Sequence, residues 1–417
     1  MTDSATKTVT PLLKPRLPYL VVDNNETLQI MIAALQANTS RIGIDAERAS
    51  GFRYGQRAYL IQIAIQNQEI FLLDPTAEFE AHSFEQMKSL ISETEWVIHA
   101  ASQDIPCLTE IGITPIKLVD TELAGRLLNY PKVSLGVLCE ELLSLSLAKE
   151  HSAVDWSQRP LPKDWLNYAA LDVDVLFDLW NALEAQLRDK SKFEIALAEF
   201  AFAAKPINKD TKPERWRGTT GIHEIKDQKQ LTAVKHLWES REELAQVKDV
   251  APGRLVPDSS LIALVKAAPT SRAELAELRA FSGRASRTYL DRWWDAYQSG
   301  LNSKNLVELR KTNTGIPNHR SWPGKFPDAH RRFLWAKKNL QALSESFGLP
   351  VENLLSPGIL KEVCFSPNSD LRTQLSNLGA RNWQIDAVFE SLEEAFQQTE
   401  LPEVEETSSA EVVENQA

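Results

Sequence analysis

The 417-residue sequence has few of the features that mark membrane, secreted and zinc-binding proteins. No run approaches the roughly 20 consecutive apolar residues that a membrane-spanning helix needs, and residues 1–11 lack the apolar block of a secretory signal. The three cysteines, Cys107, Cys139 and Cys364, lie too far apart to indicate a disulfide framework or a zinc cluster. We therefore expect a cytoplasmic protein with no membrane partner.

The sequence also lacks an excess of basic charge. It has 46 Lys and Arg against 57 Asp and Glu, a formal net charge of −11, which at first argues against a nucleic-acid partner. The charge is unevenly spread, however, because residues 1–204 and 341–417 each have a net charge of −11, whereas residues 205–340 have +11. The total therefore does not exclude a nucleic-acid partner for the middle block.

Two kinds of hydrophobic pattern divide the chain. Between residues 18 and 204, strand-like and helical segments alternate, with a hairpin turn at 67–68 and a long helix over 163–187, which is typical of a mixed α/β sheet. Residues 222–304 and 327–398 show only short helical segments, separated by proline and glycine, and predict two small all-α domains. The remaining segments are an N-terminal extension (1–17), a basic linker (205–221), a second linker (305–326) and an acidic tail (399–417) that we expect to be disordered.

Four carboxylates in the α/β part are candidate metal ligands. Asp45 and Glu47 lie at the end of a predicted strand, where alternation points both side chains to one face. Asp104 stands where a strand stops and a helix begins, and Tyr168 and Asp172 have the spacing that stacks two side chains on one helical face. Taken singly, these residues are also typical of a solvated strand edge or a helix start. Brought together without a cation they would repel one another, whereas Mg²⁺ or Mn²⁺ would stabilise the group.

The same residues resemble the three exonuclease motifs of the DEDD superfamily of 3′→5′ exonucleases, in its tyrosine subclass. The histidine subclass would carry a histidine five residues before the last aspartate, where this chain has Asn167. Short flanking motifs make residues 18–190 resemble the ribonuclease D family. These motifs are Asp120-Thr121, Leu135-Gly136, Lys149, residues 155–161 (DWSQRPL) and residues 168–173 (YAALDV). One departure is Ala46, where the family often has threonine, and alternation predicts that its side chain points away from the metals.

This resemblance implies a ribonuclease H-like fold for the domain at 18–204 and a hydrolase that uses two divalent ions, Mg²⁺ or Mn²⁺, and no small-molecule cofactor. It implies that Asp45, Glu47 and Asp172 hold the first ion and that Asp45 also touches the second, on which Asp104 acts directly or through water. Tyr168 would orient the attacking water. The expected reaction releases 5′-mononucleotides from RNA 3′ ends, with tRNA precursors as substrates and a monomer as the active form.

Residues 222–304 resemble the HRDC domain, the helicase and ribonuclease D C-terminal module, and residues 327–398 resemble its second, more divergent copy. The excess of basic charge in residues 205–340 can hold an RNA backbone without reading its sequence. The candidate RNA contacts are Arg284, Arg287, Arg331, Arg332, Lys337 and Lys338. Two alternatives stay open. A non-catalytic RNA-binding protein is disfavoured by the intact carboxylate set, and a DNA exonuclease of the same superfamily is not excluded by the residues themselves.

Overall fold

A computed structural model describes residues 8–37, 40–148, 154–205, 214–309 and 315–402. Residues 206–213 of the basic linker, the acidic tail from residue 403 on and Lys149 lie outside these residues. The chain divides into two compact units: the first contains residues up to 123, 132–185 and 200–312, and the second contains residues 124–131, 186–199 and those from 313 on. No helix among the described residues combines the length and the apolar composition needed to cross a bilayer.

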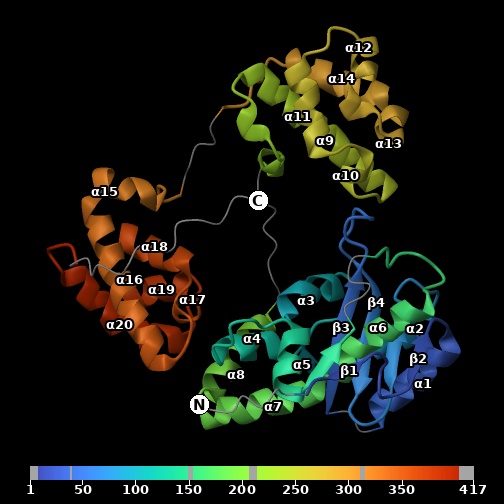
Figure 1. The fold of residues 1–417 in the computed structure, drawn as a ribbon, viewed down its shortest axis with the longest axis vertical. Coiled ribbons are helices and arrows are strands. Elements are labelled where there is room, and N and C mark those ends of the chain that lie inside the picture. Colours follow the sequence, from blue (N-terminus) through green and yellow to red (C-terminus); the bar gives the residue numbers. More distant parts are fainter. Residues whose placement is uncertain (1–7, 38–39, 149–153, 206–213, 310–314, 403–417) are drawn as a thin grey trace. The chain divides into compact units, whose positions relative to one another are not determined.

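A six-stranded mixed sheet forms the centre of the first unit (Figure 1). In spatial order its strands are β2 (Tyr19–Val22), β5 (Ile70–Leu73), β4 (Ala58–Ile65), β3 (Arg41–Arg48), β6 (Glu95–Ile98) and β7 (Leu118–Asp120). The neighbours β3, β4 and β5 pair antiparallel, and the other neighbours pair parallel. All residues of β4 are buried, as expected for a central strand that is covered on both faces. The mixed sheet predicted from the sequence is therefore confirmed.

Helices and a short second sheet surround these strands. Strands β1 (Thr10–Leu12) and β8 (Leu145–Leu147) pair in parallel and form the two-stranded sheet. The helices are α1 (Asn25–Gln36), α2 (Ala81–Glu93), α3 (Ala101–Glu110), α4 (Thr121–Leu127), α5 (Leu135–Leu143), α6 (Lys163–Asp174), α7 (Leu176–Asp189) and α8 (Phe193–Ala203). Helix α6 packs against β3, β4 and β5 and so lies on one face of the sheet (Figure 1).

The single helix predicted over 163–187 is wrong, because the chain is interrupted at Val175 between α6 and α7. Arg16 contacts the chain at this break, where its Nη2 donates to the backbone carbonyl of Asp174 at 2.6 Å. In an uninterrupted helix, that carbonyl accepts from the backbone N–H four residues later. The same guanidinium donates to the Asp174 carboxylate at 3.1 Å and to Asp178 at 2.8 Å, so the N-terminal extension is fixed to the helix break.

A small all-α domain completes the first unit, and its described residues contain no strand, as predicted. Its helices are α9 (Gln228–Lys248), α10 (Pro252–Leu255), α11 (Asp258–Ala267), α12 (Arg272–Glu277), α13 (Arg284–Thr288) and α14 (Leu290–Leu301). The core includes Leu237, Trp293 and Tyr297. Helices α9 and α14 approach so closely that a Cβ at Gly300 would lie 2.4 Å from the Cα of Ala233, and glycine is therefore required there.

The loop between β3 and β4, residues 49–57, contacts this all-α domain. The Tyr54 hydroxyl donates to Glu242 on α9 at 3.1 Å, and the Tyr54 ring packs against the helical core. The backbone N–H of Ala251 donates to the carbonyl of Phe52 at 3.0 Å, and the Arg254 guanidinium lies 4.0 Å from the centre of the Phe52 ring. The loop that follows β3 is therefore shaped partly by helices some 200 residues later, as in the bond from Arg254 to the loop.

The second unit is helical and includes the segment around α8. Its own helices are α15 (Trp322–Lys325), α16 (Pro327–Phe347), α17 (Val351–Leu354), α18 (Pro357–Phe365), α19 (Leu371–Asn377) and α20 (Asn382–Gln397). The buried Glu199 carboxylate accepts two bonds of 2.6 Å from Arg381 and one of 2.7 Å from the Trp383 indole. Lys192 donates to the carbonyl of Gly348 at 2.7 Å. These bonds connect the C-terminal helices to the segment 186–199.

Candidate active site

Strand β3 supplies two of the candidate carboxylates. The strand continues to Arg48, so Asp45 and Glu47 lie within it and not at its end as the sequence suggested. Alternation holds at these positions, because Ala46 is buried whereas the residues on either side are only partly buried. The backbone of Asp45 is paired with Gln62 of the fully buried strand β4, which makes this part of β3 a rigid support.

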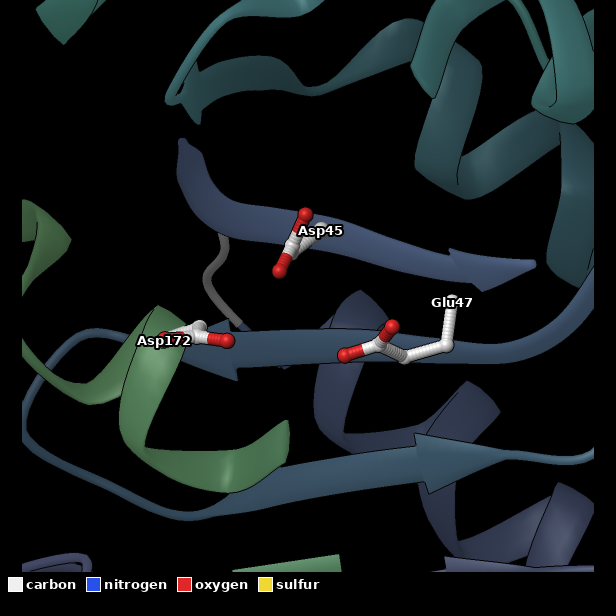
Figure 2. Close-up of side chains that lie close together, drawn as sticks. All are labelled: Asp45, Glu47 and Asp172. Atoms are coloured by element: carbon white, nitrogen blue, oxygen red, sulfur yellow. The ribbon is translucent and has the colours of Figure 1, made fainter. Parts of the chain in front are cut away.

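Helix α6 brings Asp172 and Tyr168 to the same place. Asp45, Glu47 and Asp172 each offer an oxygen that lies within 4.8 Å of the others, and Figure 2 shows the three carboxyl groups facing a common space. As the four-residue spacing predicts, the Tyr168 hydroxyl hydrogen-bonds to the Asp172 carboxylate. Two elements that are distant in the sequence thus form one cluster of oxygen ligands.

Asp104 completes the cluster from the first turn of α3. It is buried, with 5% of its surface exposed, and it shares a hydrogen bond with Asp45. The four carboxylates and Tyr168 line one pocket of about 310 Å³. Its other lining residues are Ile44, Ala46, Arg48, His99, Ala100, Gln103, Leu135 and Leu176. The structure therefore brings together all five residues that the sequence proposed for catalysis.

The electrostatics of the pocket favour a divalent cation. Burial, followed by the charges of the neighbouring carboxylates, raises the pKa of Glu47 and of Asp104 well above the ordinary value. The pKa of Asp172 is also raised well above its ordinary value by burial and by Asp45, and burial raises the pKa of Asp45 itself. Carboxylates in such a group retain protons unless a cation takes their place. An all-oxygen donor set of this kind suits a hard divalent metal.

Asp120 supports the site. The sequence pointed to this residue only as part of a motif shared with the family and did not predict its supporting role. One oxygen of its buried carboxylate accepts from the backbone of Ala100 at 3.1 Å and of Glu122 at 2.8 Å, and the other accepts from Ala101 at 2.9 Å. Ala100 has a left-handed backbone with φ of 58°, which is unfavourable for alanine. Asp120 thus holds the turn from which α3 presents Asp104.

The hydrogen bonds of His99 and Arg159 indicate that both residues support the structure around the pocket. The Nδ1 atom of His99 lies 2.8 Å from the Thr121 hydroxyl, which fits a supporting role at the pocket wall. Arg159 donates to both oxygens of Asp74 and to the backbone carbonyls of Trp156 and Tyr59. These bonds fix the segment after residue 154 to the end of β5, so a structural role accounts for Arg159.

Of the six candidate RNA contacts, Arg331 and Arg332 take part in contacts within the second unit. Arg331 pairs with Asp328 at 2.6 Å, and the Nε of Arg332 donates to the carbonyl of Cys364 at 2.8 Å. These contacts occupy donors that would otherwise be available to phosphate.

The other four candidates are exposed. Arg284 and Arg287 lie on α13 of the first unit, whereas Lys337 and Lys338 lie on α16 of the second unit. Each unit therefore carries one of these pairs of exposed cations.

Three families match the chain. Residues 19–188 match the family described as 3'-5' exonuclease, and residues 230–297 match the HRDC domain. Residues 315–396 match a family described as 3' to 5' exonuclease C-terminal domain.

Several named proteins are similar in sequence. Ribonuclease D of Nitrobacter hamburgensis is 29% identical over 259 residues, which are 60% of this chain and 65% of that protein. Ribonuclease D of Zymomonas mobilis is 31% identical over 261 residues, which are 60% of this chain and 66% of that protein. The chain thus spans slightly less than two thirds of the length of these relatives.

Solved structures share the fold over almost the whole chain. A protein from Bifidobacterium adolescentis is 32% identical, with a TM-score of 0.83 over 94% of this chain and 100% of that one. Escherichia coli RNase D is 20% identical, with a TM-score of 0.64 over 91% of this chain and 99% of that one. The mixed sheet with its carboxylate cluster lies in the region that matches the 3'-5' exonuclease family, and the region that matches the HRDC domain follows it. Within that class, the chain is similar in sequence to ribonuclease D proteins.

Proposed function

We propose that the protein is a hydrolase, a metal-dependent 3′→5′ exoribonuclease that releases 5′-mononucleotides from RNA 3′ ends. The observation that carries this proposal is the convergence of Asp45, Glu47 and Asp172 within 4.8 Å in one pocket with Asp104 and Tyr168. A carboxylate cluster with so much mutual repulsion is costly unless it holds cations. The presence of this cluster in a partly buried pocket supports a catalytic role over a non-catalytic RNA-binding one.

The proposed metal ligands follow the geometry. Asp45, Glu47 and Asp172 would hold the first ion, and Asp45 would share the second with Asp104, to which it is hydrogen-bonded. Mg²⁺ and Mn²⁺ are the proposed ions because all the ligand atoms are hard oxygens. Bound ions of this kind supply an activated water and neutralise charge that develops on the phosphate.

Tyr168 is proposed to orient the attacking water and not to deprotonate it. Burial, together with the charges of Asp172, Glu47 and Asp45, raises the pKa of the Tyr168 hydroxyl above its ordinary value of 10. The hydroxyl therefore keeps its proton at neutral pH and donates a hydrogen bond to the Asp172 carboxylate. This bond fixes the orientation of the hydroxyl, whose oxygen can accept a hydrogen bond from the attacking water.

The finer features of the proposal concern domains and substrate. We place the exonuclease domain at 18–204, an HRDC domain at 222–304 and a second HRDC-like domain at 327–398. The exposed pairs on α13 and α16 would hold structured RNA through its phosphates. The proposed substrates are tRNA precursors with a free 3′ end, cut by a cytoplasmic monomer.

The decisive experiment compares four substrate forms. These are an RNA with a free 3′ hydroxyl, the same RNA with a blocked 3′ end, a DNA of the same sequence and a tRNA precursor. Each form is labelled at its 5′ end and incubated with Mg²⁺, Mn²⁺ or EDTA, beside an Asp172→Asn variant. We expect stepwise shortening of RNA with a free 3′ end, only in metal, and none by the variant. Internal cleavage or activity in EDTA would contradict the proposal. Equal shortening of DNA would favour a DNA exonuclease, and binding without any cleavage would favour a non-catalytic protein.

A further inference from the structure

A β-bulge lies at the end of β3, immediately after the second ligand carboxylate. Glu47 is paired with Leu60 of β4, but the next residue, Arg48, is paired with Ala58. The register therefore advances by two residues on β4 for one residue on β3. Bulges of this kind redirect a side chain and are common beside active sites.

The bulge turns Arg48 toward the metal-site face of the sheet. Residues that are directly opposite in an antiparallel pair share a face, and residues two apart on one strand also share a face. Leu60 and Ala58 are two apart, so their partners Glu47 and Arg48 point to the same side. Regular alternation would have placed Arg48 on the opposite face with Ala46.

The surroundings of Arg48 agree with this orientation. Among the described residues that line the pocket, Arg48 is the only arginine or lysine. Its Nη2 lies 3.9 Å from the Asp104 carboxylate, which is too long for a hydrogen bond, and its side chain is 29% exposed. By contrast, Arg53 of the following loop donates to Ser157 at 2.7 Å. Arg48 therefore faces the pocket with an ion pair but no close hydrogen bond to Asp104.

The charges in the pocket indicate what Arg48 can bind. Without metal, its charge offsets part of the repulsion among the carboxylates, because it lowers the pKa of Asp45, Glu47 and Asp104 against the effect of burial. Two divalent ions would neutralise the four carboxylates of the pocket, and the charge of Arg48 would then be in surplus. A guanidinium presents a planar fork of donors that matches phosphate oxygens.

We infer that Arg48 binds a phosphodiester of the substrate inside the pocket, next to the metal ligands. This inference rests on the proposed exonuclease function and adds a substrate-binding residue to it. The alternative is that Arg48 only balances the charge of the metal-free carboxylates. In that case its removal would lower the metal concentration needed for activity and leave the reaction at saturating metal unchanged.

The test uses a dinucleotide RNA, whose single phosphodiester occupies the pocket without help from the helical domains. The kcat and KM values are measured for the wild type, Arg48→Met and Arg48→Lys over a Mn²⁺ titration. The matched control is Arg41→Met, because Arg41 is also on β3, is 29% exposed and pairs with an acid, Glu95, outside the pocket. We expect kcat/KM to fall about 10- to 100-fold in Arg48→Met, as for the loss of a hydrogen bond to a charged group. Arg48→Lys should recover part of this loss, and Arg41→Met should resemble the wild type.

The outcomes separate the inference from the function on which it rests. Wild-type kcat/KM in Arg48→Met at saturating Mn²⁺, with only the metal midpoint changed, would overturn the inference and leave the exonuclease function intact. Wild-type behaviour of Arg48→Lys would also count against it, because lysine retains the charge and lacks the fork. If Arg48→Met does not fold by circular dichroism, Arg48→Lys alone decides. A wild-type protein that cleaves neither the dinucleotide nor longer RNA in any metal would overturn both proposals.

Discussion

Replacing Asp172 with asparagine is expected to stabilise the metal-free protein. The ligand oxygens of Asp172, Asp45 and Glu47 lie within 4.8 Å of one another, and unit charges at that distance repel by about 3 kcal/mol at an effective dielectric constant of about 20. Bound protons already relieve part of this repulsion, because the pKa values of these groups are raised. We therefore expect a net gain of about 1–3 kcal/mol in the free energy of unfolding, or about 2–10 °C in Tm. Asparagine keeps an oxygen that can accept from Tyr168.

Differential scanning calorimetry in EDTA and in Mg²⁺ or Mn²⁺ checks this expectation. The wild type should gain about 2.7 kcal/mol when free metal is about 100-fold above its Kd, whereas Asp172→Asn should gain little. As a control, Asp164→Asn removes an exposed charge from the first turn of the same helix and should keep the metal response. The repulsion argument is refuted if Asp172→Asn is less stable than the wild type in EDTA.

The same comparison should depend on pH in a defined direction. Raised pKa values mean that the folded protein binds protons more tightly than the unfolded chain, for which the Asp value is 3.8. The contribution of these bound protons to the free energy of unfolding is then fully present below that value. It is lost as the pH rises through the raised pKa of the folded state. The advantage of Asp172→Asn in EDTA should accordingly be large near pH ~8 and shrink toward pH ~5. An advantage that grows as the pH falls would contradict the assigned direction of the pKa shifts.

Three further results are expected. Tyr168→Phe should lower kcat about 10- to 100-fold because the attacking water loses the hydroxyl that orients it, while calorimetry still shows the metal response; an unchanged kcat would remove Tyr168 from the proposed mechanism. Asp120→Asn should lower the free energy of unfolding by about 2–4 kcal/mol in urea titrations, because the amide turns a donor toward backbone N–H groups; wild-type stability would contradict this role. Replacing Lys337 and Lys338 with glutamine should weaken RNA binding and flatten its salt dependence in fluorescence titrations, and an unchanged slope would exclude them as phosphate contacts.

Local periodicity was sufficient to predict which neighbouring residues of the site lie on the same face of a strand or helix. Alternation along β3 placed Asp45 and Glu47 together, and the four-residue spacing on α6 placed Tyr168 beside Asp172. Both are short-range rules that depend only on the secondary structure. The convergence of β3, α3 and α6 on one pocket came from the family resemblance, because no local pattern shows which elements meet.

The features that could not be predicted depend on contacts between distant parts of the chain. The break at Val175 lies where Arg16 hydrogen-bonds to Asp174, 158 positions away in the sequence. The parallel pairing of β1 with β8 likewise joins Thr10 to Leu145. The orientation of Arg48 depends on a bulge, and the sequence of β3 alone gives no sign of it because the two-residue step is taken by β4.

Deleting the HRDC domain would remove more than a surface that can hold RNA. The loop that follows Asp45, Glu47 and Arg48 would lose its hydrogen bonds to Glu242 and Ala251, and the Tyr54 ring would lose the core on which it packs. A fall in activity after such a truncation would then report on the shape of the catalytic pocket as well as on the affinity for RNA. Removal of this domain therefore acts on the catalytic strand much as a point mutation in its loop would, from about 200 residues further along the chain.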